Sequence, residues 1–143
     1  MMTFVAIEPP RVFPAMRFID SEAMIAWLVN VVGFSVHARH MDADGQLVHA
    51  QLSYGSSMIM CGQARDDVYG RLVGEPDGKG GKSIYVAAGD VDALFKRMKK
   101  AGATIVEEPA DRHYGNREFI CRDPEGNVWS FGTYWPKAYE NPD

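Results

Sequence analysis

The 143-residue sequence predicts a single α+β domain in which one βαβββ unit is used twice. Two observations support this prediction. In each half a strand-like run begins about twenty residues before a glycine that ends a helical pattern, namely Gly33 and Gly102. In each half several short strand-like runs joined by turns follow that glycine. The chain is long enough for one domain with a sizeable core and too short for two independent domains.

The first unit, module one, is expected over residues 11–64. Asp20 and Ser21 offer side-chain oxygens to the unpaired N–H groups that begin a helix, and Gly33 tolerates the positive φ that often ends one. Turn-forming residues at 42–45 and 55–56 separate the later strands. The predicted elements are, in order, a strand at 12–18, a helix at 20–32, and short strands near 37–40, 47–53 and 58–60.

The predicted helix at 20–32 is unusual because residues 23–32 carry no charge and are apolar nearly all round. A helix that only lies on a sheet keeps one polar face for solvent. We therefore expect something beyond its own sheet to cover this helix. Either a partner subunit or the N-terminal segment could do so.

Residues 65–82 are rich in glycine, aspartate and charge, and predict a mobile linker between the two units. Within it, Gly80-Gly81-Lys82-Ser83 imitates the end of a phosphate-binding loop. Such a loop follows a strand and opens a helix, whereas Ser83 here begins a strand. The sequence therefore does not predict a nucleotide site.

The second unit, module two, is expected over residues 83–136. A strand is predicted at 83–87 and a helix at 90–100, whose Val91, Leu94, Phe95 and Met98 recur at helical spacing on one face. Another strand is predicted at 103–107. Residues 114–134 then read as two strands joined by a turn at 123–126, where acidic residues lack the DxDxDG spacing of a calcium loop.

Composition excludes several classes of partner. The net charge is -4, and the sequence has no long Lys/Arg run, so we expect neither nucleic acid nor an anionic membrane as a partner. The first ten residues lack the basic region and the long apolar run of a signal peptide or a membrane span, which favours a cytoplasmic protein. Cys61 and Cys121 lie in apolar, strand-like surroundings without CxxC spacing, and we expect buried reduced thiols.

Residues 117–134, REFICRDPEGNVWSFGTY, resemble the end of glyoxalase/bleomycin resistance proteins in the vicinal oxygen chelate superfamily. That superfamily also includes extradiol dioxygenases, and the resemblance extends from Val12 to Trp135. It implies two βαβββ modules with curled mixed sheets, a cavity on the concave side, helices on the outer face, and assembly as a homodimer. In the metalloenzymes of the family, the first and last strands of each module carry the metal ligands.

At the four places where the resemblance implies metal ligands, the sequence has Phe13, Met60 (or Met58 on the same face), Ser83 and Ser130. Zinc, nickel, manganese and iron need imidazole nitrogens or carboxylate oxygens, which these residues do not supply. We therefore expect no metal cofactor, and no metal-dependent glyoxalase or dioxygenase activity.

Strand alternation predicts which side chains line the cavity in place of a metal. It puts Val48 and Glu118 on the opposite side, and Trp129 and Phe131 against the helices. Cys121 is expected to face inward. The predicted ligand-binding residues are Phe13, Gln51, Ser53, Met58, Met60, Ser83, Tyr85, Phe119 and Ser130, with His49 beside them.

Apolar walls with a few polar groups are typical of a small-molecule pocket. The sequence thus predicts a metal-free protein that sequesters an apolar or aromatic ligand. The alternative is a metal-independent lyase or isomerase in which His49 acts as the base, since His49 is the inward residue able to serve as a general base near neutral pH. A hydrogen-bonded structural role for His49 is the competing interpretation.

Overall fold

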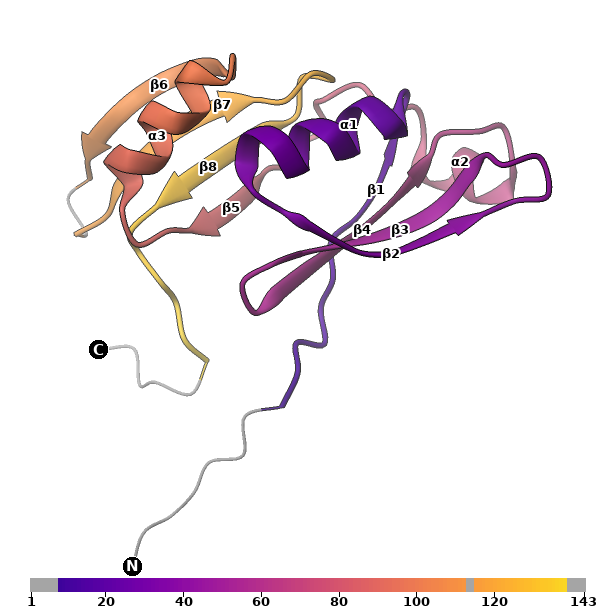
Figure 1. The fold of residues 1–143 in the computed structure, drawn as a ribbon, viewed down its shortest axis with the longest axis horizontal. Helices are drawn as coiled ribbons and strands as arrows, with labels where there is room; N and C mark the ends of the chain where they lie inside the picture. The colour runs from indigo at the N-terminus through magenta and orange to yellow at the C-terminus, as the bar shows by residue number, and fades with distance from the viewer. Residues whose placement is uncertain (1–7, 113–114, 139–143) are drawn as a thin grey trace, which may run out of the picture.

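The computed structural model describes residues 8–112 and 115–138 (Figure 1). Its elements follow the predicted order with some shifted ends; for example, the first strand begins at Ala15 rather than Val12. The elements are β1 (Ala15–Phe18), α1 (Ser21–Trp27), η1 (Leu28–Val32), β2 (Ser35–Met41), β3 (Leu47–Tyr54), β4 (Ser57–Gln63), α2 (Val68–Val73), β5 (Ile84–Ala87), α3 (Val91–Lys100), β6 (Thr104–Asp111), β7 (Arg117–Arg122) and β8 (Val128–Gly132).

Within the described residues the strands form two four-stranded mixed sheets, one from each module. Their orders are β1-β4-β3-β2 and β5-β8-β7-β6, with the first pair in each sheet parallel and the others antiparallel. Helices α1 and α3 pack on one side of the sheets and leave the other side open (Figure 1). The predicted α+β fold with two βαβββ modules is confirmed.

The helix ends follow the sequence signals. Asp20 accepts a hydrogen bond from the Ala23 N–H at 3.1 Å, and Asp90 accepts one from the Ala93 N–H at 3.0 Å. The first helix widens into the π-helical turn η1, where the N–H groups of both Gly33 and Phe34 donate to the Leu28 carbonyl. Gly33 then ends the helix at a φ of 110°.

Module two covers the apolar helix of module one. Trp129 of β8 packs against Trp27 and Phe34, with ring centroids 6.1 and 6.0 Å apart. Arg97 of α3 donates to the Val32 carbonyl at 2.7 Å. The expectation that something beyond its own sheet covers this helix is confirmed, and the cover comes from the same chain.

The turn between β7 and β8 is held by two carboxylates. Asp123 is buried and accepts hydrogen bonds from the N–H groups of Glu125 and Asn127 and from the Trp129 indole, each at 2.9 Å. Glu125 reaches module one, where it accepts hydrogen bonds from the Ile19 and Asp20 N–H groups at 2.7 and 2.8 Å. These acidic residues therefore fix a turn and join it to the start of α1.

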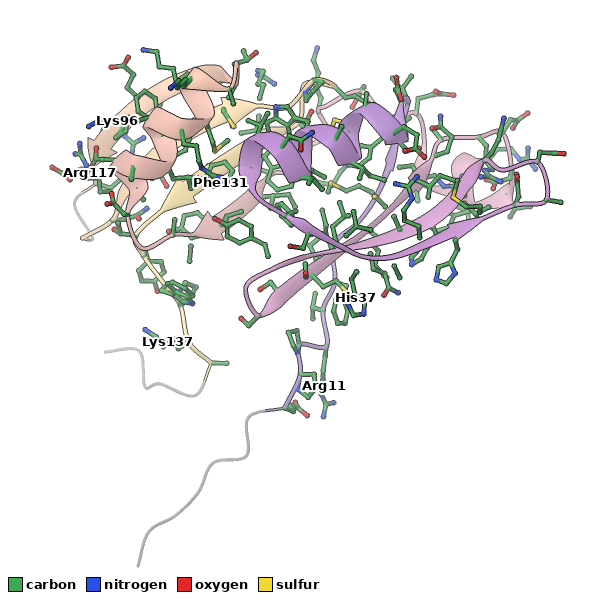
Figure 2. All side chains as sticks on the ribbon, viewed as in Figure 1. Arg11, His37, Lys96, Arg117, Phe131 and Lys137 are labelled. Atoms are coloured by element: carbon green, nitrogen blue, oxygen red, sulfur yellow. The ribbon has the colours of Figure 1, made fainter. Side chains whose placement is uncertain are left out.

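The pairing of β7 with β8 corrects the predicted orientation of Phe119. Phe119 lies opposite Phe131 and Cys121 lies opposite Trp129, so all four side chains share the helix side of the sheet. Phe119 is fully buried, 5.1 Å from the Phe131 ring, and Phe131 lies between α1 and α3 in the view of Figure 2. The prediction that Phe119 and Cys121 face the cavity is wrong.

The physical reason is the length of the hairpin loop. The Asp123 N–H donates to the Asn127 carbonyl, which makes Arg122 and Val128 the first paired residues. Shifting one strand by a single residue moves every side chain to the other face. As a result Glu118 and Ile120 occupy the face on which Phe119 was expected.

A β-bulge corrects the orientation of Val48. The register between β2 and β3 changes after the pair His40 and His49, so that Leu47 is buried and Val48 is exposed. The Val48 carbonyl oxygen then lies close to β4, so that a Cβ at Gly62 would be 2.5 Å from it. The bulge therefore requires glycine at position 62.

The two cysteines have the surroundings that the sequence predicts. Cys61 and Cys121 are free, buried thiols, as expected, and burial raises the pKa of Cys61 to about 11 and that of Cys121 to about 12. Both thiols are thus protonated at neutral pH and poor nucleophiles.

In the described part of the chain, no helix combines the length and apolar character needed to cross a membrane. The cytoplasmic location remains a prediction.

The orientation of β7 is testable by two neighbouring truncations. Phe119→Ala should lower the free energy of unfolding by about 3–5 kcal/mol because it empties a core position. Ile120→Ala, on the open side of the sheet, should lower it by less than about 2 kcal/mol. Urea unfolding followed by circular dichroism measures both, and equal losses, or a larger loss for Ile120→Ala, would contradict the register.

Candidate functional site

The side of the sheets turned away from α1 and α3 is called here the open face. In module one, Gln51 pairs with Met60 and Ser53 pairs with Met58, which places these four side chains together on the open face, and His49 follows two residues from Gln51. The predicted common orientation is confirmed for this group. Their role in binding stays a prediction.

In module two, Tyr85 and Ile120 both lie beside Ser130 on the open face. The Tyr85 hydroxyl donates to the Tyr134 carbonyl at 2.7 Å and approaches Asn116 Oδ1 at 3.2 Å. Ser83 precedes β5 and is exposed. Gly132 makes room for this arrangement, because a Cβ there would lie 2.5 Å from the Tyr85 hydroxyl.

Glu118 also lies on the open face, contrary to the prediction. Its carboxylate accepts hydrogen bonds from Arg112 Nε at 3.1 Å and from Asn116 Nδ2 at 3.0 Å, and only 14% of the side chain is exposed. Arg117, the preceding residue, pairs with Asp92 and Asp111. The open face therefore does contain a carboxylate, but that carboxylate is paired with a guanidinium.

A hollow of about 220 Å³ opens on module one. Its walls are mostly apolar, with one imidazole and one guanidinium among them. The lining residues are Ala15, Met16, Arg17, Val48, His49, Met60, Cys61, Gly62 and Tyr69. The hollow thus joins His49 and Met60, which the sequence predicted, with Arg17 and Tyr69, which it did not. Phe13 precedes β1 and is not part of the first strand, where it was predicted. Ala15 and Arg17 occupy that strand and pair with Met60 and Gly62 of β4.

Tyr69 reaches the hollow because part of the predicted linker is helical. Asp67 begins α2 by accepting a hydrogen bond from the Gly70 N–H at 2.7 Å. Both oxygens of the same carboxylate accept from Arg17, at 2.7 and 3.0 Å, and the Arg17 guanidinium lies 4.8 Å from the Tyr69 ring centroid. Residues 68–73 of the predicted linker at 65–82 are therefore helical, and the mobility of this linker stays a prediction.

The sequence contains a signal for α2. Asp67 is a good N-cap, Val68 and Leu72 are spaced as neighbours on one helix face, and Gly74 is a good stop. The surrounding glycines and charges hide this signal. The short helix is held in place by the tertiary pair of Arg17 with Asp67.

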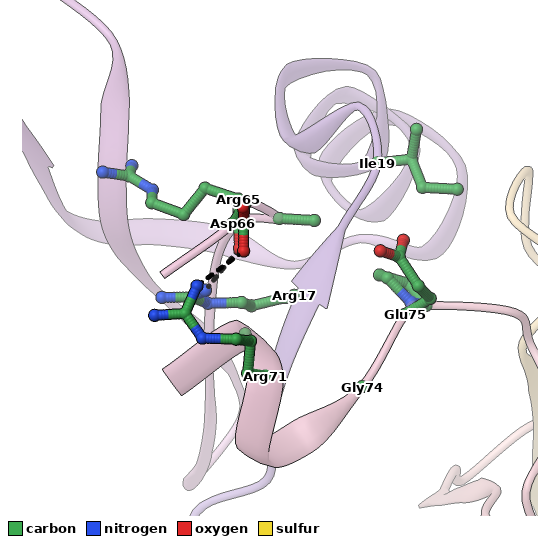
Figure 3. Close-up of a pocket in the computed structure, with 10 residues that line it drawn as sticks. Arg17, Ile19, Arg65, Asp66, Arg71, Gly74 and Glu75 are labelled. Carbon is green, nitrogen blue, oxygen red and sulfur yellow. Dashed lines mark hydrogen bonds and ion pairs between the residues drawn. The ribbon is translucent and has the colours of Figure 1, made fainter. Parts of the chain in front are cut away.

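A larger pocket of about 480 Å³ lies against α2 and the residues that flank it on both sides (Figure 3). Arg17, Arg65 and Arg71 line it together with Asp66 and Glu75. Arg71 pairs with Asp66 at 2.8 Å, as the dashed lines show, and Arg17 is held by Asp67. Arg65 donates to the Leu47 carbonyl at 3.2 Å. Because Arg17 and Arg71 already have carboxylate partners and Arg65 has this carbonyl, the apolar hollow is the better candidate for a ligand site.

The positions that correspond to the family metal ligands do not fit a metal ion. Met60 supplies a thioether, Ser83 and Ser130 supply neutral hydroxyls, and Phe13 supplies no donor atom. Hard or borderline divalent ions need imidazole or carboxylate ligands at such a site. In the part of the chain that the structure describes, no three His, Cys, Asp or Glu side chains gather as a metal site.

Comparison with known proteins gives a consistent family. A sequence model of the Glyoxalase/Bleomycin resistance protein/Dioxygenase superfamily matches residues 13–131. An uncharacterized protein of Mycobacterium tuberculosis (strain H37Rv) is 30% identical over 125 residues, covering 86% of this chain and 74% of that protein.

Solved structures show the same similarity. The crystal structure of TioX from Micromonospora sp. ML1 has a TM-score of 0.69 at 31% identity and covers 86% of this chain and 94% of that one. TnmS3, described as an antibiotic binding protein from Streptomyces sp. CB03234, has a TM-score of 0.65 at 20% identity, with 90% and 97% coverage. At that identity, the likeness to TnmS3 shows the fold alone.

The pair of Arg17 and Asp67 makes the docking of α2 dependent on pH. The hydrogen bond from Arg17 lowers the pKa of Asp67 to about 2, below its ordinary value of about 3.9. The stabilisation is therefore present above about pH 4 and is lost as the pH falls towards 2. Amide exchange at Gly70 and Arg71, corrected for its intrinsic pH dependence, should show protection that decreases over this range.

Asp67→Asn should abolish that pH dependence and leave both amides weakly protected throughout. The control is Asp66→Asn, which changes the neighbouring exposed carboxylate and should behave like the natural sequence. Strong protection of Gly70 and Arg71 at all pH values in Asp67→Asn would show that α2 docks without this pair.

Proposed function

The chain belongs to the Glyoxalase/Bleomycin resistance protein/Dioxygenase superfamily, and from this premise we propose that it binds an apolar or aromatic small molecule on its open face without a metal ion. The observation that carries the proposal is the hollow walled by Met60, Val48 and Tyr69. Met60, which stands at one of the positions where the family resemblance implies a metal ligand, lines this hollow and offers only a thioether.

The chemistry of the hollow favours this class of ligand. Ligand pockets combine apolar walls with a few polar groups that set orientation. Met60 offers a flexible, polarizable thioether that adapts to an apolar partner and makes favourable contacts with aromatic rings. His49 and Gln51 supply hydrogen-bonding groups at one edge, with their side-chain nitrogens 3.4 Å apart.

Arg17 is better suited to shape the hollow than to anchor an anionic ligand. Its guanidinium is already held by both oxygens of Asp67 and lies over Tyr69, and only 18% of the side chain is exposed. A ligand carboxylate or phosphate would have to compete with Asp67 for the same N–H groups. We therefore favour an uncharged or weakly charged ligand.

We also propose that two copies of the chain assemble into a homodimer. The sheets stay open, and large apolar side chains remain accessible, among them Val48 at 42% and Tyr85 at 39% exposure on the sheets and Leu72 at 79% on α2. Extended apolar surface of this kind is typical of association or ligand binding. A second copy would enclose the hollow more completely.

Sedimentation velocity measures the mass of the particle in solution, which should be that of two chains. A monomer at working concentrations would contradict the proposed homodimer.

The second candidate function is a metal-independent lyase or isomerase with His49 as base. His49 supports it because its imidazole lines the same hollow and lies within contact of the Gln51 amide. A general base must reach the proton that it removes in a bound substrate. The candidate thus needs the same ligand site and adds one proton transfer.

Binding can be tested on the chelator-treated chain with a thermal-shift screen of planar aromatic compounds, including aromatic antibiotics. A ligand at about one hundred times its Kd should add about 2.7 kcal/mol to the free energy of unfolding and raise Tm. Met60→Ala should raise the Kd about tenfold, which is about 1.4 kcal/mol. Val106→Ala, an exposed apolar residue of β6 in module two, is the control and should bind like the natural sequence.

Two results would contradict the proposal: binding that disappears after chelator treatment and returns with a transition metal, or a Kd unchanged by Met60→Ala. The enzymatic candidate is separated by following the ligand for product formation. His49→Ala should abolish conversion if His49 is the base, whereas a pure binding protein gives no product with either chain.

A further inference from the structure

Two histidines face one another across β2 and β3. His40 and His49 are direct cross-strand partners, and their ring centroids lie 5.7 Å apart with the ring planes 30° from each other. His40 is exposed and His49 is half-buried, so solvent reaches the pair. This cluster lies on strands that do not carry the metal positions implied by the family resemblance.

The spacing of the rings suits a shared ion. An imidazole nitrogen binds a divalent transition metal at about 2.0–2.1 Å, which brings the centroids of two rings on one ion to about 5–6 Å apart. The 5.7 Å separation of His40 and His49 falls in this range before any side-chain movement. Shared binding then requires only that rotation about the side-chain bonds aim one nitrogen of each ring at a common point.

Gln51 places a third donor beside the pair. Its side-chain nitrogen lies 3.4 Å from His49 Nε2, and a half-turn of the amide puts the carbonyl oxygen in that place. Two donors about 2.1 Å from one ion at a tetrahedral angle are themselves about 3.4 Å apart. After that half-turn, the separation of Gln51 Oε1 from His49 Nε2 would match one edge of a coordination tetrahedron.

The β-bulge at Val48 creates this juxtaposition. The extra residue shifts the register so that Met41 pairs with Leu47 while His40 still pairs with His49. Gly62 admits the displaced Val48 carbonyl on the neighbouring strand. A regular ladder that kept Met41 opposite Leu47 would place His40 opposite Val48 and bring His49 to the other face.

We propose that His40, His49 and Gln51 form a binding site for one divalent transition-metal ion of the imidazole-preferring group, with water completing its coordination. Copper, nickel and zinc belong to this group, whereas magnesium and calcium prefer carboxylate-rich oxygen sites. The three donors are neutral, and copper should bind most tightly, as the Irving–Williams order requires. The site is separate from the metal-free ligand binding proposed above, although it shares His49 with the rim of that hollow.

The test uses the full chain after chelator treatment and titrates it with Cu²⁺, Ni²⁺, Zn²⁺ or Mg²⁺ alone, followed by isothermal titration calorimetry. One Cu²⁺ ion per chain should bind, with Ni²⁺ and Zn²⁺ weaker and Mg²⁺ undetected. His40→Ala and His49→Ala should each weaken Cu²⁺ binding by at least about tenfold, and Gln51→Leu should weaken it less. The Cu²⁺ electron paramagnetic resonance spectrum should show two coordinated nitrogens and lose one in either histidine variant.

The matched control is His37→Ala, which removes another exposed histidine of β2. It should leave the affinity and the spectrum unchanged, and circular dichroism should confirm that each variant is folded. The proposal is overturned if His40→Ala and His49→Ala bind Cu²⁺ like the natural sequence, or if His37→Ala loses as much affinity as they do. Metal titration without any organic ligand keeps this result independent of the ligand-binding proposal.

Discussion

The hydrogen bond between the Trp129 indole and the buried Asp123 carboxylate is the constraint on which the rest of the structure depends. Asp123 also accepts the backbone N–H groups that close the turn, so one carboxylate fixes both the loop and the large side chain that follows it. Trp129 then packs on Trp27 and Phe34 of module one. A polar carboxyl group is retained in this core because its oxygens are occupied by donors.

This constraint sets the faces of the sheet of module two. Closing the loop between Asp123 and Asn127 pairs Arg122 with Val128. Because side chains alternate along a strand, this pairing decides the face of every other residue of β7 and β8. Aromatic side chains gather on the helix side and join the modules into one core. The open side of module two keeps Tyr85, Ile120 and Glu118, whose charge Arg112 balances.

Module one obtains its candidate site through local departures from regular structure. Gly62 permits a bulge at Val48. This bulge interrupts the regular pairing of β2 with β3 and leaves two histidines facing each other. The pair of Arg17 with Asp67 brings α2 to the sheet, and Tyr69 becomes a wall of the hollow. A small irregularity and one ion pair thus shape a site in which the proposed ligand binding and the proposed metal site meet at His49.

The sequence by itself determined the two βαβββ modules and the helix ends at Asp20, Gly33 and Asp90. These features depend on residue type and on local spacing, which a linear sequence displays. The common face of Gln51, Ser53, Met58 and Met60 was also predictable, because a tight turn leaves little freedom of register.

Only the tertiary structure decided the orientation of Phe119 and Glu118, the exposure of Val48 and the docking of α2. The alternation of a strand gives which residues share a face, but loop length and bulges choose which face that is. Those choices depend on contacts between residues far apart in the sequence, such as Trp129 with Trp27, or Arg17 with Asp67. Contacts of this kind exist only once the chain has folded, and local propensity therefore does not predict them.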